Sequence, residues 1–398
     1  MDLAFSDEEL RLRDEVRAWL ARNVPGAVDR REKGPVDRPE SGPVDRLEEG
    51  PVDRLEEARA WQAKLASAGW VGIDWPAEYG GRGASPLQVA VLNMEYARSG
   101  APQLVNRVGI NLAAPTLLAH GTPEQCRRYL PSIADASEIW CQLFSEPGAG
   151  SDLTGLATRA EPVSGGWLVS GQKVWTSYAL VATFGLCLAR TSPGARPAEG
   201  LSLLVVDMGD PGVTVRPLVQ ITGDAEFNEV FLEEVFVPDD RVIGQVGRGW
   251  QVASTTLAHE RGTNFPFKEE VVHEGHLARL VAGALDSSSF DDPAIADAIV
   301  DSYALLVILR THNWRTMSKL ALGAEPGPES SIVKLTWSQM TERLSEAALD
   351  ALGPTSPTMG PEQRQWLWSK AAGIAGGTSE IQKNVIAERI LGLPREPA

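Results

Sequence analysis

FSEPGAGSD, at residues 144–152, is the densest functional signal in this sequence. Gly148, Ala149 and Gly150 let backbone amides approach a ligand closely, and Ser151 adds a hydroxyl. Such a loop can hold a phosphate or a carbonyl group, although a glycine-rich loop by itself is more often only a turn. GQKVWTS follows at residues 171–177 and places an indole beside two hydroxyls. That combination suits a flat, hydrogen-bonding ring, and a core tryptophan with exposed hydroxyls is the simpler alternative.

The pattern around these two segments predicts a sheet domain between two helical regions. Short β-rich runs are separated by Gly, Pro and Asp clusters, as in a compact antiparallel sheet, at residues 167–170, 184–190, 201–206, 213–218 and 226–237. Helical stretches precede them at residues 55–65, 88–98, 109–120 and 124–133, and helices return after Gly244. The predicted α+β chain has a helical N-terminal domain (1–138), a central antiparallel β-domain (139–243) and a C-terminal helical bundle (244–398).

Two details support the helical assignments. Ser6 followed by acidic residues is typical of a helix N-terminus. Apolar residues recur at helical spacing and predict two buried faces, one formed by Val333, Trp337, Met340, Leu344, Ala347 and Ala351, the other by Ile295, Ile299, Tyr303 and Leu306.

The composition narrows the class of protein. The chain has 398 residues, 43% of them hydrophobic, and a formal charge of −16, which argues against nucleic acid or an anionic membrane as a partner. Three cysteines without C-x-x-C spacing argue against disulfide and zinc scaffolds, and His259 has no second ligand at metal spacing. No signal peptide or membrane-spanning run is recognisable, so we expect a cytoplasmic protein without a metal.

A short repeat interrupts the N-terminal region. GPVDR occurs three times at a spacing of eight residues within residues 34–57, after a degenerate copy. Because each of the three GPVDR copies contains proline, the repeat cannot be a solenoid unit, and we expect a charged surface loop over residues 28–57. A docking segment for a partner is the alternative.

In combination, the motifs resemble the acyl-CoA dehydrogenase family over nearly the whole chain. FSEPGAGSD and GQKVWTS at this interval carry the resemblance, and GWVGIDWPAEYGGRG (69–83), EVFVPDDRVIG (234–244) and GGTSEIQ (376–382) strengthen it. The resemblance implies a C-terminal four-helix bundle, bound FAD and the desaturation of an acyl-CoA thioester between its α and β carbons. It also implies an oligomer in which a neighbouring subunit completes each site.

The resemblance carries binding roles onto individual residues. It implies that the first segment lines the flavin and the thioester, that the second packs against the flavin ring, and that the last approaches the FAD of a partner subunit; these residues are Gln142, Phe144, Ser145, Gly150 and Ser151, then Trp175, Thr176 and Ser177, then Thr378 and Glu380. Ser151 also lies near the substrate in this scheme.

The position of the catalytic base is unusual. Many family members carry a glutamate immediately before Gly-Thr-Ser, where this chain has Gly376. Isovaleryl-CoA and long-chain acyl-CoA dehydrogenases carry the base instead on the first helix after the β-domain, before an arginine. That position here is Glu260, followed by Arg261. We therefore expect Glu260 to be the base and Arg261 to help bind substrate, with a surface ion pair as the alternative.

Two further departures point to a subgroup. The Arg-x-x-Phe-Gly turn of typical members is missing between Lys268 and Asp291, and DALGPTS at 350–356 replaces Gln-x-Phe-Gly-Gly. These features resemble the heteromeric acyl-CoA dehydrogenases of steroid side chains. The resemblance implies a branched or bulky acyl group, an electron-transfer flavoprotein as acceptor, and a homo- or hetero-oligomer, dimer or tetramer. A flavin monooxygenase or oxidase on the same fold and a non-catalytic partner subunit are the alternatives.

Overall fold

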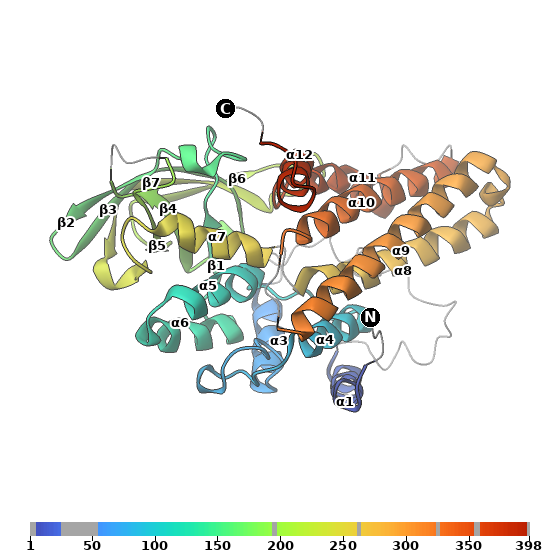
Figure 1. The fold of residues 1–398 in the computed structure, drawn as a ribbon, viewed down its shortest axis with the longest axis horizontal. Coiled ribbons are helices and arrows are strands. Elements are labelled where there is room, and N and C mark those ends of the chain that lie inside the picture. The colour runs from blue at the N-terminus through green and yellow to red at the C-terminus, as the bar shows by residue number, and fades with distance from the viewer. Residues whose placement is uncertain are drawn as a thin grey trace. The chain divides into compact units, whose positions relative to one another are not determined.

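A computed structural model describes residues 5–24, 55–192, 197–260, 264–323, 327–353 and 359–395. The repeat loop predicted at 28–57 lies outside the described residues up to residue 54, and helix α3 begins at Leu55. Contacts divide the chain into two compact units (Figure 1). We call them the sheet unit, which contains α3, α5–α7 and β1–β8, and the bundle unit, which contains α1, α4 and α8–α12. The three-domain division made from sequence stays a prediction.

The sheet unit combines eight strands with four α-helices among its described residues. Its helices are α3 (Leu55–Ser67), α5 (Ala114–His120), α6 (Pro123–Asp135) and α7 (Gly249–Glu260). Its strands are β1 (Trp140–Leu143), β2 (Arg159–Val163), β3 (Gly166–Ser177), β4 (Phe184–Arg190), β5 (Leu201–Asp207), β6 (Val213–Leu218), β7 (Phe227–Pro238) and β8 (Val242–Ile243). The runs predicted at residues 184–190 and 213–218 match β4 and β6, whereas β1 and β2 are too short to give a pattern.

The strands form one mainly antiparallel sheet, as predicted. Their order is β6-β7-β3-β2-β4-β5-β8, and β1 pairs with β4 beside this path. Two pairings are parallel, β1 with β4 and β2 with β4. The sequence pattern does not reveal these two, because side chains alternate with a period of two in parallel and antiparallel strands alike.

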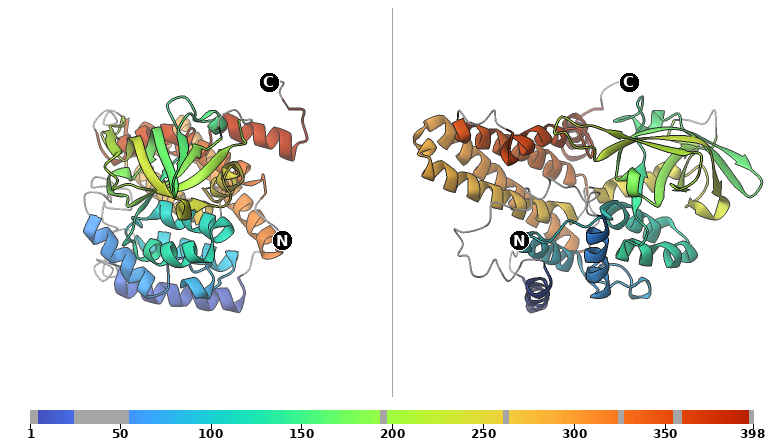
Figure 2. Two further views of the ribbon diagram at one scale, coloured as in Figure 1. Left: turned by 90° about the vertical axis from the view of Figure 1, so that its left-hand side faces the viewer. Right: turned by 180° about the vertical axis from the view of Figure 1, so that it is seen from behind.

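The sheet is buried on both faces where β4 and β5 lie. Alternate residues of β4, such as Leu186 and Cys187, enter two different apolar clusters. The first cluster packs against α5, α6 and α7, and Figure 2 shows the cyan helices α5 and α6 along that face. The second cluster packs against β3 and β7. The three cysteines, Cys126, Cys141 and Cys187, are free thiols buried in these two clusters.

The bundle unit is built of helices and contains no strand among its described residues. Its helices are α1 (Asp7–Asn23), α4 (Pro86–Ser99), α8 (Asn264–Asp286), α9 (Pro293–Ala321), α10 (Ser330–Leu352), α11 (Pro361–Ala372) and α12 (Ser379–Val385). Helix α10 packs against α8, α9, α11 and α12, and α4 packs against α1 and α8. The predicted N-cap is confirmed, since Ser6 forms a capping box with Glu9. No described helix is long and apolar enough to cross a membrane.

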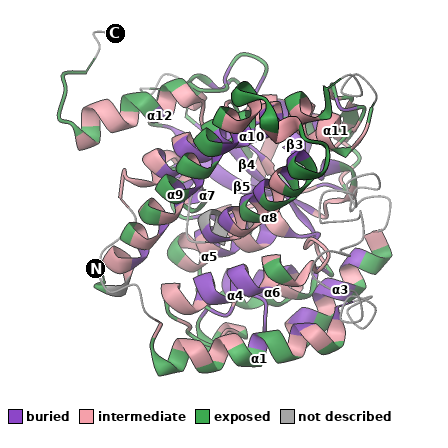
Figure 3. Ribbon diagram, turned by 90° about the vertical axis from the view of Figure 1, so that its right-hand side faces the viewer, coloured by how far each residue is buried: buried purple, intermediate pink, exposed green. Residues whose placement is uncertain are grey.

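The predicted buried face of α10 is largely confirmed, and that of α9 is wrong at one residue. Val333, Trp337 and Met340 are buried in the bundle core, with Leu344 and Ala347. In α9, however, Tyr303 is 58% exposed, and Ser302 is buried in its place. The seam of α9 follows Ile299, Ser302 and Leu306, because a helical seam alternates steps of three and four. Figure 3 shows exposed residues of α9 in green beside its buried ones.

Candidate flavin and substrate site

The FSEPGAGSD loop forms a tight turn directly after β1. Glu146 and Ala149 close it with two backbone hydrogen bonds, Glu146 N to Ala149 O at 3.1 Å and Ala149 N to Glu146 O at 3.0 Å. Gly148, Gly150 and Ser151 are exposed on this turn. A Cβ atom added to either glycine would meet no other atom within 4 Å. The turn therefore presents bare backbone to open space, which is what a ligand needs in order to approach it closely.

The residues before this turn are fixed more firmly. Gln142 lies on β1 in register with Leu186 of β4, and Phe144 is 3% exposed. The carbonyl of Ser145 accepts a hydrogen bond of 2.9 Å from the backbone N–H of Val174. This bond joins the predicted flavin loop to β3, two segments that the sequence separates by about 30 residues, so the structure brings them together.

Trp175 lies in a strained and exposed position on β3. The pairing of β3 with β7 shifts register between Lys173 and Thr176, which marks a β-bulge. Within this bulge Trp175 has a φ of 61°, in the left-handed region that a bulky residue rarely adopts. Its side chain is 63% exposed, and its ring lies edge-on to that of Phe227, with centroids 6.3 Å apart and an interplanar angle of 83°. Strain that exposes an indole is typical of a functional position.

The two residues after Trp175 differ in what they present. Thr176 is only 1% exposed, and its hydroxyl has no hydrogen-bond partner among the described residues. Its side chain therefore faces the protein interior, and only its backbone can contact a ligand. Its carbonyl already accepts from the Asn228 amide at 3.0 Å. Ser177, at the end of β3, is partly exposed.

A buried ion pair lies behind the exposed loop. Lys173 Nζ lies 2.9 Å from Glu146 Oε1, and the two side chains are 0% and 7% exposed. Burial raises the pKa of the Glu146 carboxyl, but Lys173 and hydrogen bonds from Thr158 and Ala157 lower it by more. The net pKa lies below the ordinary value of 4.5, so this carboxyl is ionised at neutral pH.

The predicted base is placed at the end of α7. Glu260 is the last residue of that helix, and the side chains of Glu260 and Arg261 lie outside the described part of the structure. Two hydrogen bonds attach α7 to α5, Thr256 to Thr116 and Thr255 to His120, each at 2.8 Å. They fix the helix whose end carries Glu260.

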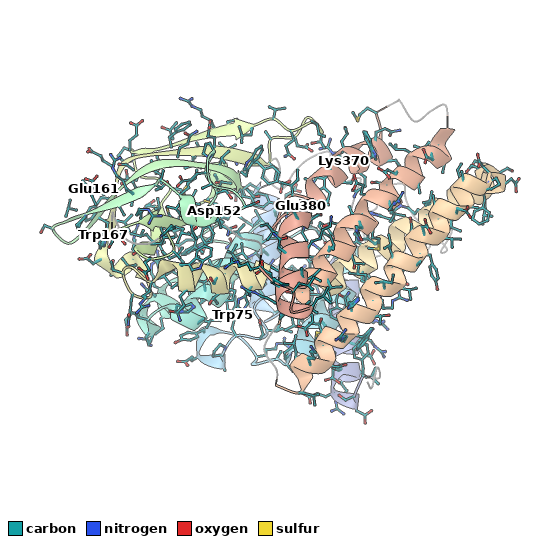
Figure 4. All side chains as sticks on the ribbon, turned by 45° about the horizontal axis from the view of Figure 1, so that its top comes forward. Trp75, Asp152, Glu161, Trp167, Lys370 and Glu380 are labelled. Carbon is teal, nitrogen blue, oxygen red and sulfur yellow. The ribbon has the colours of Figure 1, made fainter. Side chains whose placement is uncertain are left out.

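The predicted C-terminal site residues belong to the bundle unit. Gly376 and Gly377 have φ values of 67° and 90°, and Thr378 caps α12 by accepting from the Ile381 N–H at 3.2 Å. The buried Gln382 side chain donates to both glycine carbonyls, at 3.2 and 3.1 Å. Glu380 is exposed on α12 (Figure 4).

Two residues of α10 hold the helix that precedes this turn. Lys334 Nζ and Ser338 Oγ donate to the last carbonyl of α11, that of Ala372, at 2.7 and 2.8 Å. A cation at this end of a helix is also favoured by the helix dipole.

Sequence reasoning missed four residues that support the predicted site segments, two in the sheet unit and two in the bundle unit. They are Glu146, Lys173, Lys334 and Gln382, all of them polar side chains that are nearly or fully buried. Glu146 and Lys173 stand inside the two quoted motifs, but each charge is marked as buried only by its partner in the other motif. Among the described residues, no group of three His, Cys, Asp or Glu side chains could hold a metal ion.

Comparisons with known proteins agree with this arrangement. Family models of the N-terminal, middle and C-terminal domains of acyl-CoA dehydrogenases match residues 6–137, 141–235 and 247–391. The chain is 44% identical over 344 residues to acyl-CoA dehydrogenase IpdE1 of Mycobacterium tuberculosis, covering 85% of this chain and 88% of that protein. It is 42% identical over 354 residues to acyl-CoA dehydrogenase FadE34 of the same organism, covering 84% of this chain and 46% of FadE34.

Two solved assemblies have the same fold. The Tcur3481-Tcur3483 steroid ACAD is 28% identical with a TM-score of 0.83, and each chain is fully covered. The ChsE4-ChsE5 complex from Mycobacterium tuberculosis is 26% identical with a TM-score of 0.81, again over both full chains.

Proposed function

Because the chain belongs to the acyl-CoA dehydrogenase family, and is an oxidoreductase of that class, we propose that it desaturates a bulky acyl-CoA thioester with FAD bound at the sheet unit. The observation that carries the cofactor assignment is the strained, exposed indole of Trp175 beside the FSEPGAGSD turn. A buried indole at this position would have supported the core-tryptophan alternative instead.

The chain's residues fit a flat, phosphate-bearing cofactor. Gly148 and Gly150 leave room for it at the turn, because a Cβ atom at either would reach no other atom within 4 Å. Trp175 offers an aromatic face, and Ser151 and Ser177 offer hydroxyls. We infer that these residues and the backbone of Thr176 hold FAD, while Thr378 and Glu380 act toward the FAD of a partner subunit.

The reaction requires a base and a polarised carbonyl. The α-proton of a thioester is weakly acidic, so hydrogen-bond donors must polarise the carbonyl while a carboxylate removes the proton. We assign that removal to Glu260 and substrate binding to Arg261 and Ser151, because glycine at 376 cannot take a proton. FAD, when bound, supplies the acceptor for the hydride that leaves the β-carbon.

Gly376 also bears on the proposed substrate, and the related complexes bear on the proposed assembly. By the family resemblance, a glutamate at residue 376 would approach the thioester, and we infer that glycine at this position makes room for a branched or ring-bearing acyl group. The similarity to a steroid ACAD and to the ChsE4-ChsE5 complex supports a bulky substrate and a hetero-oligomer. We infer an electron-transfer flavoprotein as the acceptor, by family resemblance.

Anaerobic mixing with acyl-CoAs tests this function. The purified assembly should show a visible flavin band that bleaches with a branched or cyclic acyl-CoA, and should bleach more slowly with octanoyl-CoA or palmitoyl-CoA. Glu260→Gln should keep the flavin band and lose about 10²–10⁴-fold in bleaching rate, the usual contribution of a general base. Glu161→Gln is the matched control, because Glu161 is exposed on β2 (Figure 4).

The other outcomes separate the alternatives. A loss smaller than tenfold in Glu260→Gln would place the base elsewhere. A flavin band that ignores every acyl-CoA but turns over with oxygen would favour the monooxygenase or oxidase. No flavin band would favour a non-catalytic subunit, and the native mass with flavin content per chain would show whether a second subunit is required.

A further inference from the structure

The buried pair of Lys173 and Glu146 does more than join two charges. We propose that this pair is a positioning element that fixes the FSEPGAGSD turn against the Trp175 bulge and thereby sets the affinity of the flavin site. The inference rests on the proposed function, since it assumes that FAD binds at these two segments.

Lys173 spans three parts of the sheet unit with one ammonium group. Its Nζ atom donates to the carbonyl of Phe144 at 3.0 Å, to Glu146 Oε1 at 2.9 Å and to the carbonyl of Leu188 at 2.8 Å. An ammonium has three protons, so these three bonds use its full capacity. The strand that carries Trp175 is thereby tied to both ends of the segment 144–146 and to β4.

Glu146 extends this connection to the other side of the loop. Oε2 accepts from the backbone N–H of Ala157 at 2.6 Å, and Oε1 accepts from that of Thr158 at 2.9 Å. The start of the FSEPGAGSD turn is thus held by Lys173, and Glu146 ties it to Ala157 and Thr158, which follow the turn and lead into β2. Side-chain bonds of one pair hold both flanks of an otherwise exposed turn.

The main effect of the pair is to position the loop, not to stabilise the fold. Two charges removed from water are costly, and well-packed apolar residues often give equal or greater stability in the same place. Lys173 is two residues from Trp175 and next to Val174, whose N–H donates to Ser145. Residues 173 and 174 of β3 therefore hold the loop, and residue 175 presents the indole. A shift of Lys173 would move the FSEPGAGSD turn and the Trp175 bulge relative to each other.

Charge-removing variants separate positioning from stability. Glu146→Gln and Lys173→Met each leave one buried charge unpaired, so each should lower the melting temperature and weaken FAD. The double variant Lys173→Met/Glu146→Gln removes both charges and keeps the volume and an amide oxygen. In flavin-free protein we expect it to melt above both single variants and below wild type, because the carbonyls of Phe144 and Leu188 lose their donor, while its Kd for FAD stays at least tenfold above wild type.

The measurements are made on flavin-stripped full-length protein. FAD is titrated by quenching of its fluorescence, and thermal unfolding is followed by circular dichroism without FAD. The visible spectrum of the reconstituted protein gives an independent readout, since a displaced indole should change the flavin band. The exposed pair Arg159 and Glu161, 2.8 Å apart on β2, supplies the control, and Arg159→Met/Glu161→Gln should change none of these values.

Each result decides between two explanations. A double variant that regains both melting temperature and FAD affinity would show that the pair acts through stability alone, which overturns the inference and leaves the proposed function intact. Single variants that bind FAD as tightly as wild type would overturn it as well. A wild-type protein that takes up no FAD would instead overturn the proposed function, and this inference with it.

Discussion

Replacing Trp175 with asparagine should cost the folded chain little and the flavin site much. Asparagine is chosen because it tolerates the left-handed backbone better than other side chains do. The substitution removes the indole face without demanding a new backbone conformation at the bulge, where φ is 61°.

The stability change follows from exposure and strain. The indole is 63% exposed, so a little over a third of its surface is buried. If a free tryptophan side chain exposes roughly 250 Å², the lost burial is about 90 Å², or about 2 kcal/mol at ~25 cal/mol per Å². Relief of left-handed strain returns about 1 kcal/mol. The net cost is therefore about 1 kcal/mol, a shift of about 2–4 °C in melting temperature.

Flavin binding should respond far more strongly. Stacking of an aromatic side chain on a flat base is worth about 1–3 kcal/mol, which corresponds to roughly 5- to 150-fold in affinity. We therefore expect the Kd for FAD to rise within that range in Trp175→Asn. Stability must be measured on flavin-stripped protein, because bound ligand would itself raise the melting temperature.

Trp140 provides the matched comparison. It is fully buried and packs edge-on against Tyr129 at 5.2 Å, so Trp140→Ala should cost about 3–5 kcal/mol. A Trp175→Asn protein that melts as early as Trp140→Ala would show that the indole is a core residue. Unchanged FAD affinity in Trp175→Asn would refute its role as a stacking face.

Three more changes have definite expected results. Gly376→Glu should lower the melting temperature, because a φ of 67° strains any L side chain by about 1–2 kcal/mol. Its turnover should not rise, because the proposed mechanism already assigns the base to Glu260; higher turnover would contradict that assignment. Burial lowers the pKa of His273 below its ordinary value of 6.5, so below that pH the unfolded chain binds more protons than the folded chain does. The free energy of unfolding, measured by urea titration, should therefore fall between about pH 6.5 and pH 5. It should fall less in His273→Gln. Lys334→Met removes a charged hydrogen bond to Ala372 and should cost about 1–3 kcal/mol in urea unfolding, whereas an unchanged midpoint would count against it.

Periodicity and capping predicted most of the helices. The spacing of Val333, Trp337 and Met340 gave the buried face of α10, because a helix with one apolar side shows its period over many residues. Tyr303 was misplaced because a large aromatic residue at a plausible spacing outweighs a serine, although Ser302 is the residue that packs inside. The sizes of the side chains do not show which residues along a helix form its buried face.

The sheet and the site were predicted less completely. Only residues 167–170 of β3 were expected as strand, yet the strand continues to Ser177 through a bulge that sequence patterns do not encode. The motif residues were found through the family resemblance. Lys173 and Glu146 were missed because a buried charge is identified only by its partner, and that partner lies 27 residues away in the chain.

The placement of the cysteines gives the chain an internal probe of local opening. All three thiols lie in the sheet unit, and burial raises the pKa of Cys187 to about 11 and that of Cys141 further, so both are protonated and unreactive in the native state. The bundle unit has no cysteine, since the chain contains only these three. Labelling of native protein with a thiol reagent therefore measures how often the apolar clusters of the sheet unit open, and amide hydrogen exchange in α10 would measure opening in the bundle unit.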